Sequence, residues 1–215
     1  MSDMGAAQSF RQSPVGERPI VAFDFDGTLT IRDSFTAFLR WRAGAAGWAI
    51  GLARMAPALA AYVGDRDRGR IKAASVREFL HDMDRATLER EAERYAEQVW
   101  DRFMRPDALA CWNAWGDKGA HRVIVTASPE TTVAPFARRL GAEGLLGTQL
   151  VFDAHDRVTG AFAGENCRGA EKVRRLHAAY GPDMTLAAAY GDTSGDTEMI
   201  AIAAEKGFRI FNGRP

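Results

Sequence analysis

The chain has 215 residues, a length that suits one α/β domain with an inserted subdomain. Lysine plus arginine and aspartate plus glutamate both number 28, so the overall charge gives no argument for a nucleic-acid partner. The cysteines are Cys111 and Cys167, and the four histidines show no metal-ligand spacing, which argues against a zinc site. Two isolated thiols are typical of a reducing compartment, and we expect a cytoplasmic protein.

The first apolar segment is Ile20-Val21-Ala22-Phe23, and it predicts a strand buried on both faces of a parallel sheet. Residues 1–18 before it are polar and interrupted by glycine and proline, which predicts a flexible tail rather than a secretory signal. Two carboxylates, Asp24 and Asp26, follow the strand at once. Because open α/β sheets bind ligands at the carboxyl ends of their strands, we expect a functional site here.

The spacing of Asp24 and Asp26 allows both side chains to face one cavity. Two carboxylates in a partly dry site do not both ionise easily, so one stays an anion while the pKa of the other rises and lets it hold a proton. Gly27 lets a ligand approach the backbone closely. Taken alone, Asp-x-Asp-Gly is more often a polar turn. A calcium loop is excluded because Leu29 and Phe35 occupy its glycine and glutamate positions.

Asp33 is expected to cap a helix that leads into an apolar segment, which begins at Ala43 and ends at Val63. Three structures compete for this segment: a packed helical hairpin, a hairpin in a membrane interface, and a membrane span. Pro57 and the single charge, Arg54, argue against the span. The basic cluster that follows is either a solvated loop or a contact with anionic lipid, and it contains Arg66, Arg68, Arg70 and Lys72.

Two further apolar strands, at residues 122–127 and 185–190, also run into polar loops and then helices. We also expect a β-hairpin within residues 148–163 and a last strand at residues 208–211. This repetition predicts a doubly wound, mostly parallel α/β sheet. The residues between the first strand and the strand at residues 122–127 contain helical patterns but no comparable strand. This predicts a core of residues 19–32 and 106–215 and an inserted helical cap of residues 33–105.

The run from Asp24 to Thr30, D-F-D-G-T-L-T after a buried strand, resembles the first motif of the haloacid dehalogenase superfamily. Asp26 is typical of its phosphatases. The resemblance implies a Rossmann-like core in which Asp24 is the nucleophile and Asp26 is the general acid and base.

Three later stretches resemble the other motifs of this superfamily. Thr126 resembles the second motif, which binds phosphoryl oxygens together with the residues that follow it, Ala127 and Ser128. Lys172 resembles the cation of the third motif, and Arg168 is the alternative for that role. The run G-D-T-S-G-D resembles the fourth motif, whose acids lie on the metal side, Asp192 and Asp196.

Together these motifs imply a Mg²⁺-dependent phosphomonoester hydrolase that acts through an aspartyl-phosphate. Asp24 and Asp192, with the backbone carbonyl of Asp26 and waters, would form the all-oxygen site that Mg²⁺ prefers. The metal and Lys172 would offset the repulsion between a phosphate dianion and Asp24.

The position of the cap between the first two motifs resembles the phosphoserine-phosphatase-like subfamily. Phosphoserine phosphatases carry a glutamate where this chain has Asp33, and a cap arginine for the substrate carboxylate, for which Arg77 is the nearest candidate. The segments around Asp33, Thr126 and Lys172 resemble instead the bacterial phosphatidylglycerophosphate phosphatases, in which an apolar segment follows the first helix.

We therefore expect a small-molecule or lipid phosphomonoester as the partner. In the lipid case, residues 43–63 would contact the cytoplasmic face of a membrane. The alternative of a different class is a phosphate-binding module without catalysis, against which the four intact motifs argue.

Overall fold

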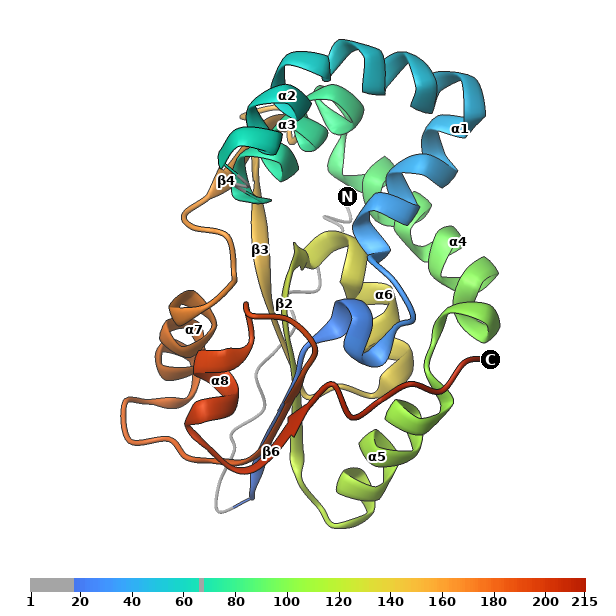
Figure 1. The fold of residues 1–215 in the computed structure, drawn as a ribbon. Helices are drawn as coiled ribbons and strands as arrows, with labels where there is room; N and C mark the ends of the chain where they lie inside the picture. The colour runs from blue at the N-terminus through green and yellow to red at the C-terminus, as the bar shows by residue number, and fades with distance from the viewer. Residues whose placement is uncertain (1–17, 66–67) are drawn as a thin grey trace, which may run out of the picture.

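The computed structural model describes residues 18–65 and 68–215, and places a six-stranded sheet at the centre of the molecule (Figure 1). The predicted tail, residues 1–17, and Arg66 lie outside the described residues, as does the side chain of Arg68. The strand order is β4-β3-β2-β1-β5-β6, and only β4 is antiparallel to its neighbour. The predicted α/β fold is confirmed, with strands β1 (Ile20–Phe23), β2 (His121–Pro129), β3 (Gly144–Phe152), β4 (Val158–Ala163), β5 (Leu186–Gly191) and β6 (Ala203–Phe208).

Alternate residues of β1 enter two different cores. Val21 and Phe23 belong to the cluster covered by α5 (Pro106–Asp117) and α6 (Glu130–Leu140). Ile20 and Ala22 belong to the cluster covered by α7 (Ala170–Tyr180) and α8 (Thr197–Ala201). Burial on both faces explains why the strand has no polar residue.

The chain order of the strands reverses beside β1. From β1 the sheet grows through β2 to β3, and the later strands β5 and β6 lie on the other side of β1. The carboxyl ends of β1 and β5 are therefore next to each other, and Asp24 N donates a hydrogen bond of 2.8 Å to Tyr190 O. Such a switch point is where open α/β sheets form their ligand crevice.

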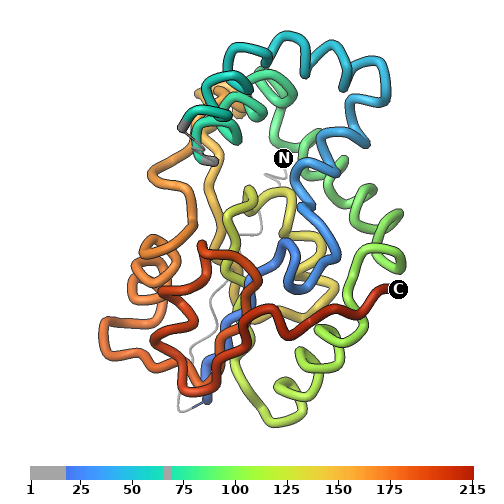
Figure 2. Tube along the Cα trace, viewed as in Figure 1, coloured from blue at the N-terminus to red at the C-terminus, as the bar shows by residue number. Residues whose placement is uncertain are grey.

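Four of the helices between β1 and β2 arch over this end of the sheet (Figure 1). Asp33 caps the first of them, as expected, by accepting a 2.6 Å hydrogen bond from Thr36 N. The β3–β4 hairpin extends from the core to the same layer (Figure 2), where Val158 N donates to Met83 O at 2.9 Å. The helices are α1 (Ser34–Arg54), α2 (Ala56–Asp65), α3 (Arg68–Leu80) and α4 (Arg85–Phe103).

Residues 43–63 form the second part of α1 and most of α2, and the chain bends by 61° between the two helices. A bend of this size does not reverse the chain, so the helical hairpin that two of the three alternatives assumed is wrong. One side of this segment is packed, because Gly51 and Met55 are buried. The other side includes exposed apolar residues, since Ile50 is 54% and Val63 is 78% exposed. No single described helix is long and apolar enough to cross a membrane, although the bent pair α1–α2 meets that criterion by length and composition.

The last strand was expected at residues 208–211, but β6 spans Ala203–Phe208. It pairs in parallel with β5 from Ala203, opposite Leu186, to Phe208, opposite Gly191. The short helix α8 ends at Ala201, so the chain enters the sheet earlier than its polar sequence suggests. Arg209 then adopts a φ of 55°, which turns the chain away from the sheet.

Candidate active site

Asp24 lies at the carboxyl end of β1 and is only 6% exposed. Its Oδ1 accepts a 2.6 Å hydrogen bond from Lys172 Nζ, and its Oδ2 accepts a 3.3 Å bond from Thr28 Oγ1. Burial raises the pKa of Asp24 to about 7, although the Lys172 ammonium opposes this shift. The carboxylate needs additional positive charge to ionise fully at neutral pH.

Lys172 is 1% exposed and comes from the first turn of α7. Besides Asp24, its ammonium pairs with Asp196 Oδ1 at 2.7 Å and donates to Val125 O at 2.5 Å. Burial alone would lower the pKa of Lys172, but the adjacent Asp24 and Asp196 carboxylates raise it above its ordinary value. Lys172 therefore remains a cation fixed between these two acids.

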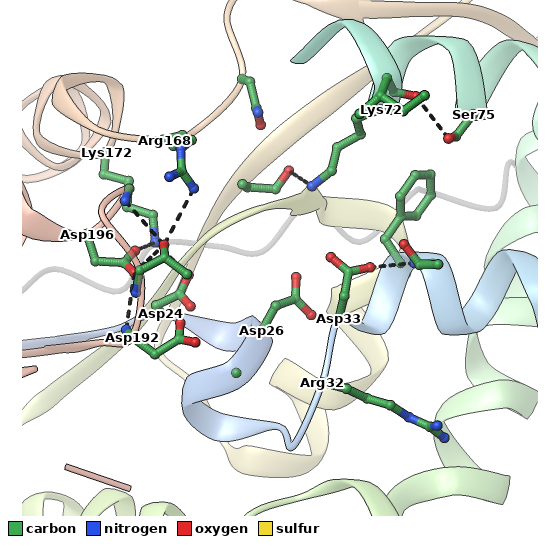
Figure 3. Close-up of a pocket in the computed structure, with 18 of the residues that line it drawn as sticks. Asp24, Asp26, Arg32, Asp33, Lys72, Ser75, Arg168, Lys172, Asp192 and Asp196 are labelled. Atoms are coloured by element: carbon green, nitrogen blue, oxygen red, sulfur yellow. Dashed lines mark hydrogen bonds and ion pairs between the residues drawn. The ribbon is translucent and has the colours of Figure 1, made fainter. Parts of the chain in front are cut away.

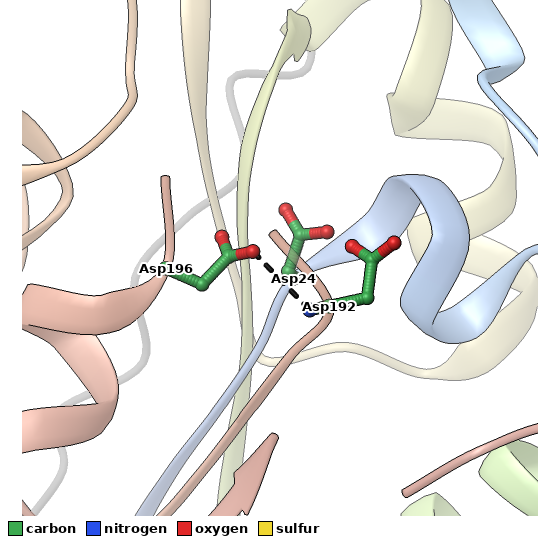
Figure 4. Close-up of side chains that lie close together, drawn as sticks. All are labelled: Asp24, Asp192 and Asp196. Atoms are coloured by element: carbon green, nitrogen blue, oxygen red, sulfur yellow. Dashed lines mark hydrogen bonds between the residues drawn. The ribbon is translucent and has the colours of Figure 1, made fainter. Parts of the chain in front are cut away.

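Asp24, Asp192 and Asp196 form a cluster in which one oxygen of each lies within 4.8 Å of the others (Figure 4). Asp196 uses both oxygens within the protein, since Oδ1 binds Lys172 and Oδ2 accepts from Thr193 N at 2.9 Å. Burial favours the neutral acid, but Lys172 and the Thr193 hydrogen bonds keep the pKa of Asp196 below its ordinary value. Asp196 therefore acts as an anion that orients its neighbours.

The donors of this cluster fit Mg²⁺, which prefers carboxylate oxygens and water. Asp192 Oδ1 is buried and has no hydrogen-bond partner among the described residues, a state that a bound cation would satisfy. Gly27 makes room for Asp192, since a Cβ built at Gly27 would lie 2.3 Å from Asp192 Oδ2. Asp24 and Asp192 are the direct ligands that this geometry offers.

Asp26 is turned away from this cluster, towards the cap (Figure 3). Its Oδ1 accepts a 2.6 Å hydrogen bond from Ser34 N at the start of α1, and its Oδ2 accepts a 2.5 Å bond from Ser128 Oγ. Burial first and the Asp33 carboxylate second raise the pKa of Asp26, whereas the Lys72 ammonium lowers it. A carboxyl group with a raised pKa suits proton transfer near neutral pH.

The three residues expected to bind phosphate from the end of β2 have different surroundings. Thr126 is buried, its hydroxyl accepts a 3.0 Å bond from Ser128 N, and it is not among the described residues that line the cavity. Ala127 lines the cavity over the acids. The Ser128 hydroxyl donates to Asp26 Oδ2 and so holds the acid in this structure.

Arg168 and Lys172 are only four residues apart but are separated by the geometry. The Arg168 guanidinium donates to Ser194 Oγ at 2.9 Å and to Thr193 Oγ1 at 3.5 Å. No described hydrogen bond or ion pair joins Arg168 to Asp24, the contact that Lys172 makes at 2.6 Å. Arg168 lines the rim of the cavity and braces the loop after β5.

A family model described as haloacid dehalogenase-like hydrolase matches residues 21–201 of this chain. The chain belongs to this family. The predicted hydrolase class is therefore confirmed, and the catalytic features described above lie within the matched residues of this haloacid dehalogenase-like hydrolase.

Known proteins resemble the hydrolase over nearly its whole length. Protein CicA of Caulobacter vibrioides is 57% identical over 202 residues, which cover 94% of this chain and 90% of the relative. Phosphoserine phosphatase SerB1 of Mycobacterium tuberculosis is 29% identical over 213 residues, which cover 93% of this chain and 67% of the relative.

Two solved structures share the fold. The structure of a protein of unknown function from Bordetella pertussis matches with a TM-score of 0.70 at 22% identity. The match covers 86% of this chain and 86% of that chain. A phospho-aspartyl intermediate analogue of phosphoserine phosphatase has a TM-score of 0.58 at 19% identity, with 88% of this chain and 85% of that chain covered.

Arg105 is a site residue that the sequence analysis missed. Its guanidinium donates to Gly27 O at 3.1 Å, to Thr30 O at 3.2 Å and to Gly213 O at 3.1 Å. Arg105 thereby holds the loop after β1 to the C-terminal segment. A residue that precedes a helix-starting proline carries no sequence signal for this role.

The cavity above the acids has a volume of about 520 Å³ and is closed on one side by the cap. Asp33 lines it, as expected, and so do Tyr62 from α2 and Lys72 from α3. Arg77, the nearest sequence candidate for binding a substrate carboxylate, is exposed and is not among the described residues that line this cavity. Lys72 is one and a half helical turns earlier and does reach it.

We expect Gly27→Ala to weaken Mg²⁺ binding by about tenfold or more, because the new Cβ displaces the Asp192 carboxylate and strains a φ of +85°. The measurement is the Mg²⁺ concentration that gives half-maximal activity. Gly44→Ala is the matched control, since Gly44 has a φ of +66° but nothing within 4 Å of its Cβ position. Equal effects of the two substitutions would show that strain alone is responsible.

The buried Asp24 should make the metal-free protein less stable as the pH rises. Its folded pKa of about 7 exceeds its ordinary value of 3.8, so the folded state binds more protons and loses stability as the pH rises between these values. In EDTA, the Tm of the wild type should therefore fall relative to that of Asp24→Asn from pH 5 to about pH 8. Saturating Mg²⁺ should remove the trend, whereas a difference in Tm that stays constant with pH would contradict it.

Proposed function

We propose that this hydrolase is a Mg²⁺-dependent phosphatase that cleaves phosphomonoesters through an aspartyl-phosphate on Asp24. The observation that carries the proposal is the buried Asp24 carboxylate, held by Lys172 at 2.6 Å inside a three-carboxylate cluster. Asp26 lies beside this cluster, on the side that faces the cap (Figure 3). This arrangement provides a nucleophile, a cation and a separate proton donor.

Asp24 attacks phosphorus, and its new bond to phosphorus forms as the bond to the substrate oxygen breaks. Asp26 gives its proton to the departing alkoxide, so that an alcohol leaves. Asp26 then takes a proton from the water that attacks the aspartyl-phosphate, which breaks the Asp24–phosphorus bond and releases phosphate. Bound Mg²⁺ supplies positive charge that offsets the repulsion between phosphate and carboxylate.

Other residues hold the reacting groups in position. Lys172 contributes a fixed positive charge beside Asp24. We propose that the Thr126 hydroxyl, whose oxygen accepts from Ser128 N, donates to a phosphoryl oxygen together with the N–H of Ala127. Ser34 N and Ser128 Oγ orient the Asp26 carboxyl group. Fixed donors of this kind need no reorganisation during the reaction.

A small phosphomonoester is the first candidate substrate. The cavity of about 520 Å³ is lined by charged and polar groups beside an apolar wall that includes Phe35 and Ile71, and the cap closes one side of it. The name of the relative SerB1 and the phosphoserine phosphatase structures support a substrate of this size.

We also propose that the protein is cytoplasmic, which its two free cysteines support.

A lipid phosphate such as phosphatidylglycerophosphate is the second candidate, and one observation favours it. Tyr62 on α2 lines the catalytic cavity, while its neighbour Val63 is 78% exposed and Ile50 on α1 is 54% exposed. The same bent segment therefore forms a wall of the cavity and an apolar surface. We propose that in this case residues 43–63 contact the cytoplasmic face of the membrane.

The test is Mg²⁺-dependent phosphate release from phosphoserine and, in parallel, from phosphatidylglycerophosphate in mixed micelles. EDTA and the Asp24→Asn variant serve as blanks. Faster release from phosphoserine supports the small substrate, and faster release from micelles supports the lipid. A lack of release from a broad panel of phosphomonoesters would contradict the proposed function and favour a non-catalytic phosphate-binding module.

A further inference from the structure

Five cationic side chains line the catalytic cavity, and four of them are committed elsewhere. Lys172 is held by Asp24, Asp196 and Val125 O. Arg105 and Arg168 are hydrogen-bonded to the loops around β1 and β5. The Arg32 side chain extends away from Asp26 and Asp33 (Figure 3), and its guanidinium lies 5.3 Å from the centre of the Phe103 ring. The fifth cation, Lys72, is the one that the cap contributes from α3.

The Lys72 ammonium has protons to spare. Its described hydrogen bond is a 2.9 Å contact to Ala127 O, at the end of β2. An ammonium group has three donors, so two remain for a ligand. Its position 5.9 Å above the Phe35 ring keeps the charge beside an apolar wall, where charge interactions are stronger than in water.

Lys72 is on the side of the cavity where the leaving alcohol must be. Figure 3 shows Asp24 and Lys172 on one side of Asp26, and Lys72 and Asp33 on the other. Because Asp26 protonates the leaving oxygen in the proposed mechanism, the alcohol extends from the phosphoryl group past Asp26 towards Lys72.

We propose that Lys72 is a specificity residue that binds a second anionic group on the alcohol part of the substrate. This inference rests on the proposed phosphatase function. The substrate class is a phosphomonoester whose alcohol carries a carboxylate or a phosphodiester, and not one with a neutral alcohol. The sequence showed Lys72 only as part of a basic cluster, since the contact with Ala127 is made across 55 residues.

The test uses two matched substrate pairs with Mg²⁺. Phosphoglycolate carries a carboxylate where ethyl phosphate has a methyl group. Phosphatidylglycerophosphate differs from phosphatidic acid, both in micelles, by a phosphodiester and the glycerol that it links. In the wild type, kcat/KM should favour the anionic member of at least one pair by about tenfold or more, equivalent to about 1.4 kcal/mol. A preference in the first pair identifies a carboxylate, and one in the second pair identifies a phosphodiester.

Lys72→Met should reduce that preference by about tenfold. The preference is a ratio of kcat/KM values, so an effect of the substitution on the pKa of Asp26, which acts on both substrates of a pair, cancels in it. Lys72→Arg should retain the preference, and Arg77→Gln, an exposed charge on the same helix, should leave it unchanged. An unchanged preference in Lys72→Met would overturn the proposal. If neither these substrates nor phosphoserine and a broad panel of phosphomonoesters are cleaved, the proposed function has failed, and if all are cleaved without preference, only the role of Lys72 has failed.

Discussion

Replacing Asp24 by asparagine is expected to reduce phosphomonoester turnover by about 10⁴-fold or more. The amide has nearly the same size and can still accept hydrogen bonds, but it cannot attack phosphorus. Lys172 keeps its partner Asp196 at 2.7 Å, so the fold should survive the change. The measurement is kcat/KM with Mg²⁺, together with a thermal melt of the variant.

A covalent trap sharpens this experiment. Acid-quenched wild type incubated with a ³²P-labelled substrate should carry label that hydroxylamine removes, as expected for an acyl phosphate at Asp24. The Asp24→Asn variant should carry none. Turnover by Asp24→Asn within about tenfold of the wild type, or label that survives hydroxylamine, would refute the proposed mechanism.

Lys172→Met is expected to lower kcat/KM by about 10³-fold, whereas Arg168→Met should lower it by less than about tenfold. Lys172 contacts Asp24 and Asp196, and without its charge three clustered carboxylates repel one another. Arg168 binds Ser194 and Thr193 on the rim. The two variants separate alternatives that sequence spacing leaves open.

The Lys172→Met variant should also melt at a lower temperature, and saturating Mg²⁺ should recover part of the loss because the cation replaces the missing charge. The Tm of Arg168→Met should change little. Equal losses of activity in both variants would mean that the cavity depends on its total charge rather than on the contact with Asp24.

The parallel sheet and its principal site acids could be predicted because they depend on local patterns. Strands buried on both faces must be continuously apolar, so polar residues at their ends are conspicuous, as Asp24 is after Phe23 and Asp192 is after Gly191. The cap of α1 follows from Asp33, whose side chain accepts from the backbone N–H group three residues later. Each of these features needs only neighbouring residues.

The features that could not be predicted depend on contacts between distant parts of the chain. Ser128 donates to Asp26, Arg105 holds Gly27, and Lys72 reaches Ala127 because the cap is folded over the sheet. The start of β6 at Ala203 is likewise set by its pairing with β5, not by its polar sequence. The sequence by itself determined which acids follow the ends of the buried strands, since strand ends and motif spacing are local. Only the tertiary structure decided which side chains line the cavity above these acids, because the packing of α1–α4 over the sheet brings those side chains together.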